Sequence, residues 1–267
     1  MNLWLFRMAW RDSRRQRGRL ALYTCAISVG IAALVAIQSL SKSLENEVEL
    51  QASALLGADL QISSNQSFGD SLRTYLFAIE AQHSEQIQLT SMIYLPQSKN
   101  SRLAQVRAVS GSFPFYGKLE TYPVSAAETF RDGARALIDD NIMLQFSVNI
   151  GDSIKVGNQL YRVEGKLLKI PGETSLRSDI QPRIYIPKTY LDSTYLLQRG
   201  SRVDYSMFLK LDSKNDVEKI TNSIQELFKD EESSLTITTV EDRKRQIGRS
   251  LTNLNRFLNL GAFIALL

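Results

Sequence analysis

An uninterrupted apolar run near the N-terminus is the strongest feature of the hydrophobic pattern. Leu20–Ser41 contains no charged residue and reads LALYTCAISVGIAALVAIQSLS. A helix of this length would cover about 33 Å, close to the roughly 30 Å hydrocarbon core of a bilayer. The pattern therefore predicts a membrane-spanning helix. A cleaved signal peptide is the rival interpretation, but its apolar core would be shorter, about 7 to 15 residues.

The helical pattern continues beyond this run. No proline or glycine interrupts Lys42–Leu56, and Gly57 follows as a typical C-terminal stop. An apolar seam recurs at spacings of seven, four and seven residues: Ile37, Leu44, Val48 and Leu55. We therefore predict one helix over Leu20–Leu56, whose outer part forms a stalk. A separate surface helix after the span is the alternative.

After Gly57 the pattern becomes that of a folded domain with both helices and strands. Alternating or β-branched runs predict strands at 58–64, 86–95, 103–109, 136–138, 153–156, 160–168, 183–186, 204–211 and 235–239. Amphipathic periodicity predicts helices at 71–82, 140–146 and 215–229, the last capped by Ser213. Polar turns at 97–100 and 157–158 join hairpins.

The order of these elements predicts an α+β domain of roughly 190 residues, a size that supports one core or two small lobes. Two β-α-β units stand at its opposite ends. We expect these units to pair in one lobe, with the hairpin region as an insert.

From Val240 a charged helical pattern leads directly into Phe257–Leu267, which reads FLNLGAFIALL. This apolar run covers only about 16 Å, half a bilayer. Because backbone groups at a chain end would be unsatisfied in hydrocarbon, we expect the chain to be the N-terminal part of a longer protein. A C-terminal helix packed on the domain is the alternative. The expected organisation is a leader (1–19), a first span with stalk (20–56), a core domain (57–239) and a returning helix with half a second span (240–267).

The positive charge of the chain is concentrated before the first span. The leader has six arginines against one aspartate, a formal charge of +5, whereas the whole chain carries +4. A basic segment beside the first span stays in the cytoplasm, and a long following domain translocates regardless of its own charge. We therefore expect a periplasmic or extracellular domain, with the leader as an amphipathic interfacial segment. The residues expected to hold this topology are Arg14, Arg15, Arg17, Arg19, Trp4 and Trp10.

Nucleic-acid binding is another interpretation of an arginine cluster. It is disfavoured here because the apolar run begins directly after Arg19.

The sequence contains no recognisable motif for catalysis. His83, the single histidine, lies among polar residues near a predicted helix end, and the single cysteine, Cys25, lies within the first span. The chain has no phosphate-binding loop, no nucleophile elbow and no paired metal ligands. Asp139-Asp140 is more typical of a helix N-cap than of a metal site, and Gly151-Asp152 of a turn. We therefore expect no enzymatic activity in this chain, no cofactor and no metal.

Several stretches carry a resemblance to a known family. They are MAWRDSRRQRGRLAL in the leader, LLGADLQI at the end of the stalk, VRAVSGSFPFYGKLET, ALIDDNIMLQFSVNIGDSIKVGNQLYRVEGKL and RIYIPKTYL. Together with the order of elements, they resemble FtsX/MacB-type permease subunits of ABC transporters, a group that includes the lipoprotein-releasing permeases. The leader and FPFYGKLE are most similar to the YbbP-type branch of predicted permeases. The resemblance covers the whole chain and marks fold and topology rather than a catalytic centre.

The resemblance implies a MacB-like periplasmic core domain in a bacterial inner-membrane protein. Such permeases have further spans, work as a homodimer or permease pair and bind a separate cytoplasmic ABC ATPase. They relay ATP-driven motion to the periplasmic domain for export or release of substrate outside the membrane, where a periplasmic partner or substrate protein is met. The later spans and the coupling loop are absent from this sequence. The residues expected to couple motion along the helices are Leu44, Val48, Leu55, Ile247 and Leu251.

A membrane-bound sensor is the alternative function, in which the extracytoplasmic domain binds a small ligand and signals inward. The spacing of the elements does not exclude it. A sensor would continue into a signalling module after the second span, whereas a permease would continue into more spans. A membrane-tethered enzyme would need an acid-base or metal constellation, which the sequence lacks.

Overall fold

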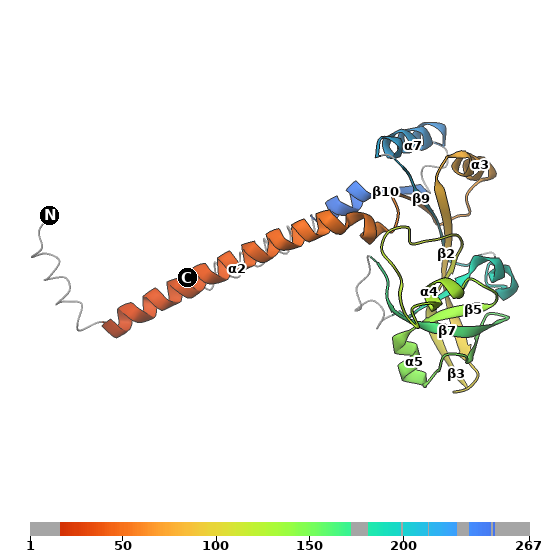
Figure 1. The fold of residues 1–267 in the computed structure, drawn as a ribbon, viewed down its shortest axis with the longest axis horizontal. Coiled ribbons are helices and arrows are strands. Elements are labelled where there is room, and N and C mark those ends of the chain that lie inside the picture. Colours follow the sequence, from red (N-terminus) through yellow and green to blue (C-terminus); the bar gives the residue numbers. More distant parts are fainter. Residues whose placement is uncertain are drawn as a thin grey trace, which may run out of the picture. The chain divides into compact units, whose positions relative to one another are not determined.

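The computed structural model describes residues 17–171, 181–198, 200–212, 214–228, 235–246 and 248 (Figure 1). The chain divides into two compact units, one of Met1–Leu50 with Lys244–Leu267 and one of Gln51–Arg243. The apolar run Phe257–Leu267 and the predicted cap Ser213 lie outside the described residues.

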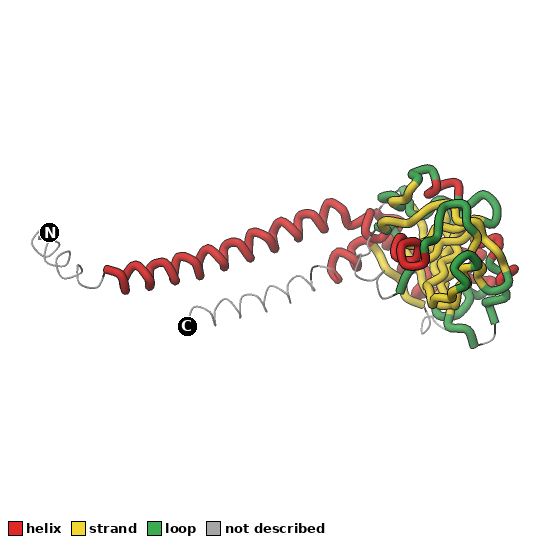
Figure 2. The backbone as a smooth tube through the Cα atoms, turned by 90° about the horizontal axis from the view of Figure 1, so that it is seen from below, coloured by secondary structure: helices red, strands yellow, loops and turns green. Residues whose placement is uncertain are grey.

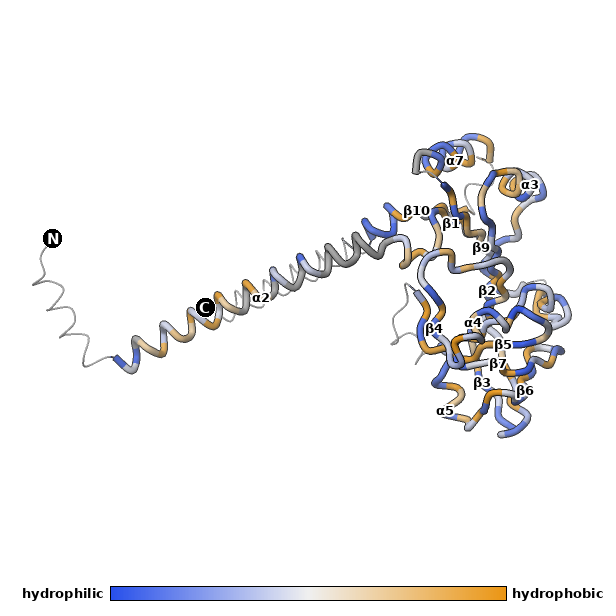
Figure 3. Tube along the Cα trace, viewed as in Figure 1, coloured by the Kyte–Doolittle hydropathy of each residue, from blue (hydrophilic) through white to orange (hydrophobic). Residues whose placement is uncertain are grey.

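Helix α2 (Arg17–Leu56) is a single helix of 40 residues, unbroken in Figure 2. It ends where predicted, because Gly57 has a φ of +75° and its amide donates to the carbonyl of Ser53 at 2.8 Å. After a hydrophilic first turn that holds Arg17 and Arg19, the first half of α2 is mostly apolar or neutral (Figure 3). Large apolar side chains on it that are more than half exposed are Leu22, Tyr23, Ile27, Val29, Ile31 and Val35.

In the part of the chain that the structure describes, no helix is both long and apolar enough to cross a membrane. The span at Leu20–Ser41 therefore stays a prediction.

The unit Gln51–Arg243 is built on one mixed sheet, whose strand order in the described residues is β10-β1-β9-β2-β3-β8-β5-β7-β4, with β6 pairing β2 and β7. Its strands are β1 (Leu60–Ser64), β2 (Gln82–Leu95), β3 (Asn100–Val109), β4 (Glu120–Tyr122), β5 (Arg135–Asp139), β6 (Ser153–Val156), β7 (Gln159–Lys169), β8 (Arg183–Pro187), β9 (Val203–Lys210) and β10 (Leu235–Thr239). A mixed α/β domain is thus confirmed.

The two β-α-β units at the ends of the domain do pair. They are β1-α3-β2 with α3 at Asp70–Ala78, and β9-α7-β10 with α7 at Lys214–Leu227. Strand β1 lies antiparallel between β10 and β9, and β9 is antiparallel to β2. This interleaving is the split β-α-β arrangement. In Figure 1, α3 and α7 lie near each other beside β9 and β10.

The segment between β2 and β9 is an insert, but it extends the same sheet instead of forming a separate lobe. Strand β2 pairs with β9 along Gln82–Leu89 and with β3 along Gln86–Leu95. The insert also holds α4 (Ala126–Thr129), α5 (Asp140–Phe146), η2 (Lys188–Tyr190) and η3 (Asp192–Thr194). Neither β4 nor α4 was predicted from the sequence. The predicted helix 71–82 is too long, because its last residues belong to β2 or precede it.

Alternation along the strands gives the sheet an apolar face with two cores. The opposite face, called the polar face below, carries polar residues beside a third core, in which Leu137, Leu167 and Tyr185 pack with Ala126 and Phe130. On the apolar face, one core joins β1 and β9 to α3 and α7 through Leu60, Ile62, Met207, Leu209, Leu72, Leu76, Ile220 and Ile224. A second core on the same face joins β2, β3 and β8 to α5 through Ile87, Leu89, Val106, Ala108, Ile184, Ile186, Ile142 and Met143. The intervening residues form the polar face: Gln61, Ser206, Gln86, Gln88, Gln105, Arg107 and Arg183.

A buried carboxylate, that of Glu85, stands between the two apolar cores. Glu85 is 9% exposed. Its carboxylate forms ion pairs with Arg73 of α3 at 3.0 Å and with Lys188 of η2. Burial, and then the charge of Arg73, lowers the pKa of Lys188. Because its two partners come from different cores, Glu85 ties the split β-α-β part to the insert.

We predict that Glu85→Gln lowers the free energy of unfolding by about 2 kcal/mol, since the partly buried ammonium of Lys188 and the half-exposed guanidinium of Arg73 lose their carboxylate. The matched control is Glu120→Gln, which breaks the exposed pair with Lys169 and should cost less than about 1 kcal/mol. Urea unfolding of the full chain in detergent, followed by near-ultraviolet circular dichroism, measures both. Equal losses in the two variants would contradict the assigned role of Glu85.

Candidate functional site

The C-terminal end of α2 is bound to a loop formed by residues 111–117 (GSFPFYG), which we call the root loop. The carbonyl of Gly57 accepts a hydrogen bond from the amide of Phe115 at 2.8 Å. A Cβ at Gly57 would lie 2.8 Å from Cε2 of Phe113, so the loop packs directly on the glycine backbone. The ring of Phe113 in turn stacks on Phe208 of β9 with centroids 4.0 Å apart.

The carboxylate of Asp59 completes this connection. Its Oδ2 accepts from the hydroxyl of Tyr116 at 2.8 Å and from the amide of Leu211 at 2.9 Å, while its own amide donates to the carbonyl of Leu209 at 3.0 Å. Burial, followed by the hydrogen bond and charge of Asp59, raises the pKa of Tyr116 to about 12. Asp59 therefore joins the end of α2 to the root loop and to the end of β9.

Beside this junction, the polar face of the sheet contains a hollow of about 340 Å³. All of its lining residues belong to the unit Gln51–Arg243. Its apolar lining comes from the end of α2, the root loop and neighbouring segments: Leu55, Leu56, Phe113, Phe208, Ile170 and Pro171. Its polar lining consists of five glutamines, three arginines and a tyrosine: Gln61, Gln86, Gln88, Gln105, Gln181, Arg107, Arg183, Arg243 and Tyr185.

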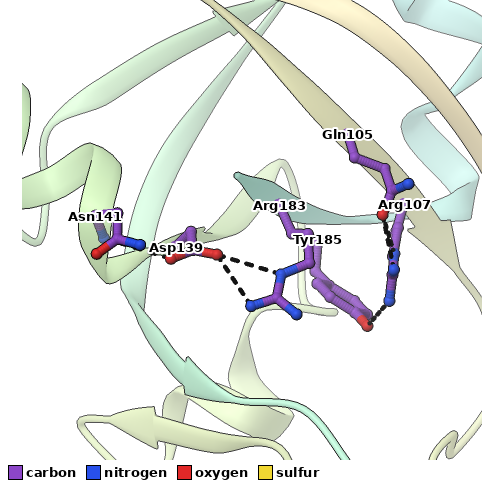
Figure 4. A network of polar contacts seen from close by, with 6 residues as sticks. All are labelled: Gln105, Arg107, Asp139, Asn141, Arg183 and Tyr185. Carbon is purple, nitrogen blue, oxygen red and sulfur yellow. Dashed lines mark hydrogen bonds and ion pairs between the residues drawn. The ribbon is translucent and has the colours of Figure 1, made fainter. Parts of the chain in front are cut away.

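Two of these arginines are buried and held in fixed orientations (Figure 4). Arg107 donates from Nε and Nη2 to Oε1 of Gln105 at 2.9 and 2.7 Å, and from Nη1 to the hydroxyl of Tyr185 at 2.9 Å. Arg183 donates from Nε and Nη2 to Oδ2 of Asp139, both at 3.2 Å. Buried guanidinium groups are costly unless paired, and these contacts offset part of that cost.

A second hollow of about 580 Å³ continues along the same face. It shares Gln88, Gln105 and Gln181 with the first, and Nε2 of Gln181 donates to Oγ1 of Thr90 at 2.8 Å. Its far end is lined by Tyr195, Leu196, Gln198, Ser201, Arg202 and Asp204. The two hollows together are called the glutamine trough.

The arrangement suits binding more than catalysis. Within the ranges that the structure describes, no group of three or more His, Cys, Asp or Glu residues could hold a metal ion. Amide groups supply hydrogen-bond donors and acceptors but no proton at neutral pH, and a guanidinium stays protonated. The described lining can therefore offer hydrogen bonds to a polar molecule.

Of the predicted coupling residues, Leu55 lies in the site, among the residues that line the hollow. Leu44 and Val48 lie within α2, and Arg17 and Arg19 are exposed in its first turn. The other predicted residues lie outside the described ranges: Trp4, Trp10, Arg14, Arg15, Ile247 and Leu251.

Three polar residues interpreted from the sequence have clear places. His83 is in strand β2 rather than at a helix end, and its Nε2 lies 2.8 Å from the carbonyl of Leu76. Asp139 is the N-cap of α5, as predicted, accepting from the amide of Asn141, but its pair with Arg183 was not foreseen. Asp152 accepts from the amide of Asn149 at 2.8 Å in the predicted turn.

The glutamine trough and the contacts of Asp59 were not predicted from the sequence. A signal was available for both. The alternation Gln86-Ile87-Gln88-Leu89 predicts a polar face opposite an apolar one. Asp59 and Tyr116 both lie in stretches that carry the family resemblance, LLGADLQI and VRAVSGSFPFYGKLET.

Comparisons with known proteins identify the type of domain. The family described as MacB-like periplasmic core domain matches residues 20–227. An uncharacterized ABC transporter permease of Escherichia coli (strain K12), YbbP, is 23% identical over 261 residues, which are 98% of this chain and 31% of the relative. The chain thus spans about a third of that relative's length.

Two solved structures also match parts of the chain. The periplasmic region of MacB from Actinobacillus actinomycetemcomitans is 16% identical, with a TM-score of 0.43 over 72% of this chain and 95% of that one. The extracellular domain of the noncanonic ABC-type transporter YknZ from Gram-positive bacteria is 11% identical, with a TM-score of 0.42 over 67% and 99% of the two chains.

We predict that Tyr116→Phe lowers the free energy of unfolding by about 1 kcal/mol at neutral pH, because the hydrogen bond to Asp59 is lost. Since the fold raises the pKa of Tyr116 from 10.0 to about 12, this stabilisation should be complete below pH 10 and lost as pH rises to 12. Thermal unfolding of wild type and variant between pH 7 and 12 measures the difference. Tyr195→Phe, at a side chain 69% exposed, is the control. A pH-independent difference would contradict the assignment.

Proposed function

Because the chain belongs to the family of MacB-like periplasmic core domains, we propose that it is the N-terminal part of the permease subunit of an ABC transporter. In this proposal the subunit relays motion driven by a partner ATPase to a periplasmic domain, for export or release of substrate at the outer face of the membrane. The name of the E. coli relative, an ABC transporter permease, supports the same class. ATP hydrolysis would belong to the separate cytoplasmic subunit.

The observation that carries this proposal is the connection between α2 and the sheet. Helix α2 has no break over 40 residues, and its end is held by the Gly57 carbonyl, the Asp59 carboxylate and the packing of Phe113. Because these contacts lock the helix end to strand β9, a displacement of the helix end would be transmitted to the domain instead of being absorbed by a flexible joint. A domain merely tethered to a membrane needs no such connection.

The exposed apolar side chains of α2 support its placement in a bilayer. Leu22, Ile27, Val29 and Val35 are each more than half exposed, and such a surface is stable when lipid covers it. We therefore propose a span at 20–41, a cytoplasmic leader at 1–19, a stalk to residue 56, a core domain at 57–239 and a returning helix from 240. The location that follows is the bacterial inner membrane.

The longer parent protein would supply the remaining parts. Since the chain spans about a third of its curated relative, later spans, the site for the ATPase and pairing with a second permease subunit are assigned to residues beyond this sequence. A periplasmic partner or substrate protein would meet the core domain.

The proposed topology predicts different access to cysteines on the two sides of the span. In a Cys25→Ser background, a membrane-impermeant maleimide should label Asp132→Cys in intact spheroplasts, because Asp132 is exposed on the core domain. Ser13→Cys should be labelled only after permeabilisation, because the basic leader stays in the cytoplasm. Labelling of Ser13→Cys in intact spheroplasts would show the opposite orientation.

The relay predicts that flexible insertions uncouple the subunit. Gly-Gly pairs inserted near Val48 or near Ile247 in the full-length parent protein should leave ATPase turnover intact and reduce export at least tenfold, because glycine interrupts a rigid helix. An insertion after Gly133, in a surface turn with open space around it, is the control. Unchanged export in both stalk variants would overturn the relay.

A further inference from the structure

The root loop is bound to the insert by one side chain, that of Arg131. Its Nη2 donates to the carbonyl of Phe113 at 2.7 Å, and its Nη1 donates to the carbonyl of Ala127, in α4, at 2.6 Å. Phe113 and Arg131 lie 18 positions apart in the sequence. The guanidinium therefore joins the backbone of the root loop to the backbone of α4, and we call these two hydrogen bonds the arginine bridge.

The insert side of the bridge is anchored in the third core. Phe130, the residue before Arg131, is fully buried and packs in that core with side chains from β5, β7 and β8. Its ring meets the ring of Tyr185 edge to face, with centroids 6.5 Å apart. The guanidinium carbon of Arg131 lies 4.6 Å from the ring centroid of Phe130. Because the ring is fixed by its packing, the guanidinium against it is held in place as well.

The other side of the bridge is the residue at which three parts of the domain meet. The carbonyl of Phe113 accepts from Arg131, its ring stacks on Phe208 of β9, and the same ring packs on the backbone of Gly57 at the end of α2. A displacement of the helix end that moves Phe113 would therefore act on β9 through the ring and on α4 through the carbonyl.

The covalent connections of the root loop do not replace the bridge. Residues 110–119 connect β3 to β4, and a connection without regular secondary structure can bend between its two ends. Arg131 instead holds the middle of this segment. A displacement of the helix end then reaches the insert directly instead of being absorbed by bending of the loop.

The chemistry of the bridge suits arginine. A guanidinium is planar and carries five donors in a fork, so that it can bind two carbonyl oxygens at once. Burial lowers the pKa of Arg131, which reflects the cost of bringing its charge into the domain. An apolar side chain could fill the same space at lower cost, but it could not hold the carbonyl of the root loop.

We propose that Arg131 is a positioning residue that fixes the root loop to α4, so that a displacement of the helix end reaches the insert as well as strand β9. The consequence for export rests on the proposed relay. The positioning of the loop does not, because it requires neither an ATPase nor a substrate and can be measured on this chain alone.

The amide of Phe115 reports on the position of the loop, because it donates to the carbonyl of Gly57 at 2.8 Å. Hydrogen–deuterium exchange of the full chain in detergent, with fragmentation that resolves single amides, measures its protection. Arg131→Met keeps an apolar side chain over Phe130 but removes the donors. Exchange of the Phe115 amide should become about tenfold faster, whereas amides of strands β2 and β3 keep their rates, because only the loop is released.

Two further variants separate positioning from a general effect on the fold. Arg131→Lys keeps the charge but has no fork, so it should restore only part of the protection of the Phe115 amide. Arg162→Met removes an exposed guanidinium from β7 of the same insert and should leave exchange unchanged. Thermal unfolding followed by circular dichroism checks that each variant keeps the fold. Wild-type exchange of the Phe115 amide in Arg131→Met would overturn the proposal, and so would equal acceleration in the loop and in strands β2 and β3.

Export by the full-length parent protein tests the consequence for the relay. Arg131→Met should lower export by about threefold or more with ATPase turnover unchanged, because one of two connections between the helix end and the domain is lost. Unchanged export in Arg131→Met, together with reduced export in the Gly-Gly stalk variants, would overturn the role of the bridge in transmission and leave the relay standing. Unchanged export in all of these variants would overturn the relay, and the exchange rates alone would then decide whether Arg131 positions the loop.

Discussion

The two-residue period of strand β2 is the constraint on which the domain depends. Its odd-numbered residues, Ile87 and Leu89, enter the apolar core, and its even-numbered residues, Gln86 and Gln88, line the trough. Because β2 pairs with β9 on one side and β3 on the other, the same register sets the faces of both halves of the sheet. A shift by one residue would bury glutamines in the core and expose the aliphatic side chains. Fold and candidate site are thus two consequences of one alternation.

Features specified by neighbouring residues could be predicted from the sequence. The stop of α2 at Gly57, the cap of α5 at Asp139 and the turn at Gly157-Asn158 each depend on residues a few positions apart. The end of α3 could not be placed, because residues from Gln82 onward pair with β9, more than a hundred positions away, and that pairing overrides local helical periodicity.

The candidate site joins residues that are distant in the sequence, which is why no spacing pattern revealed it. Asp59 meets Tyr116 across 57 positions, Arg107 meets Tyr185 across 78, and Arg183 meets Asp139 across 44. The strand order decides which of these residues meet, and the insert between β2 and β9 makes that order unusual. The family resemblance marked the stretches that contain most of these residues without saying which atoms meet. Glu85 is a further case. The alternation of strand β2 predicts only that Glu85 faces the core, whereas its partners, Arg73 and Lys188, come from α3 and η2.

The end of α2 forms part of the lining of the trough, so the position of the helix end and binding in the trough are linked. Leu55 and Leu56, the last residues of α2, line the same hollow as Arg107 and Arg243. If a displacement of the helix end changes the shape of that hollow, it changes the affinity of whatever binds there. Linkage then requires the bound molecule to bias the helix end by the same free energy. A molecule bound in the trough would therefore bias the position of the helix end. The direction of the coupling depends on which position of the helix end gives the hollow the higher affinity, because only a difference in affinity between two positions can shift their populations.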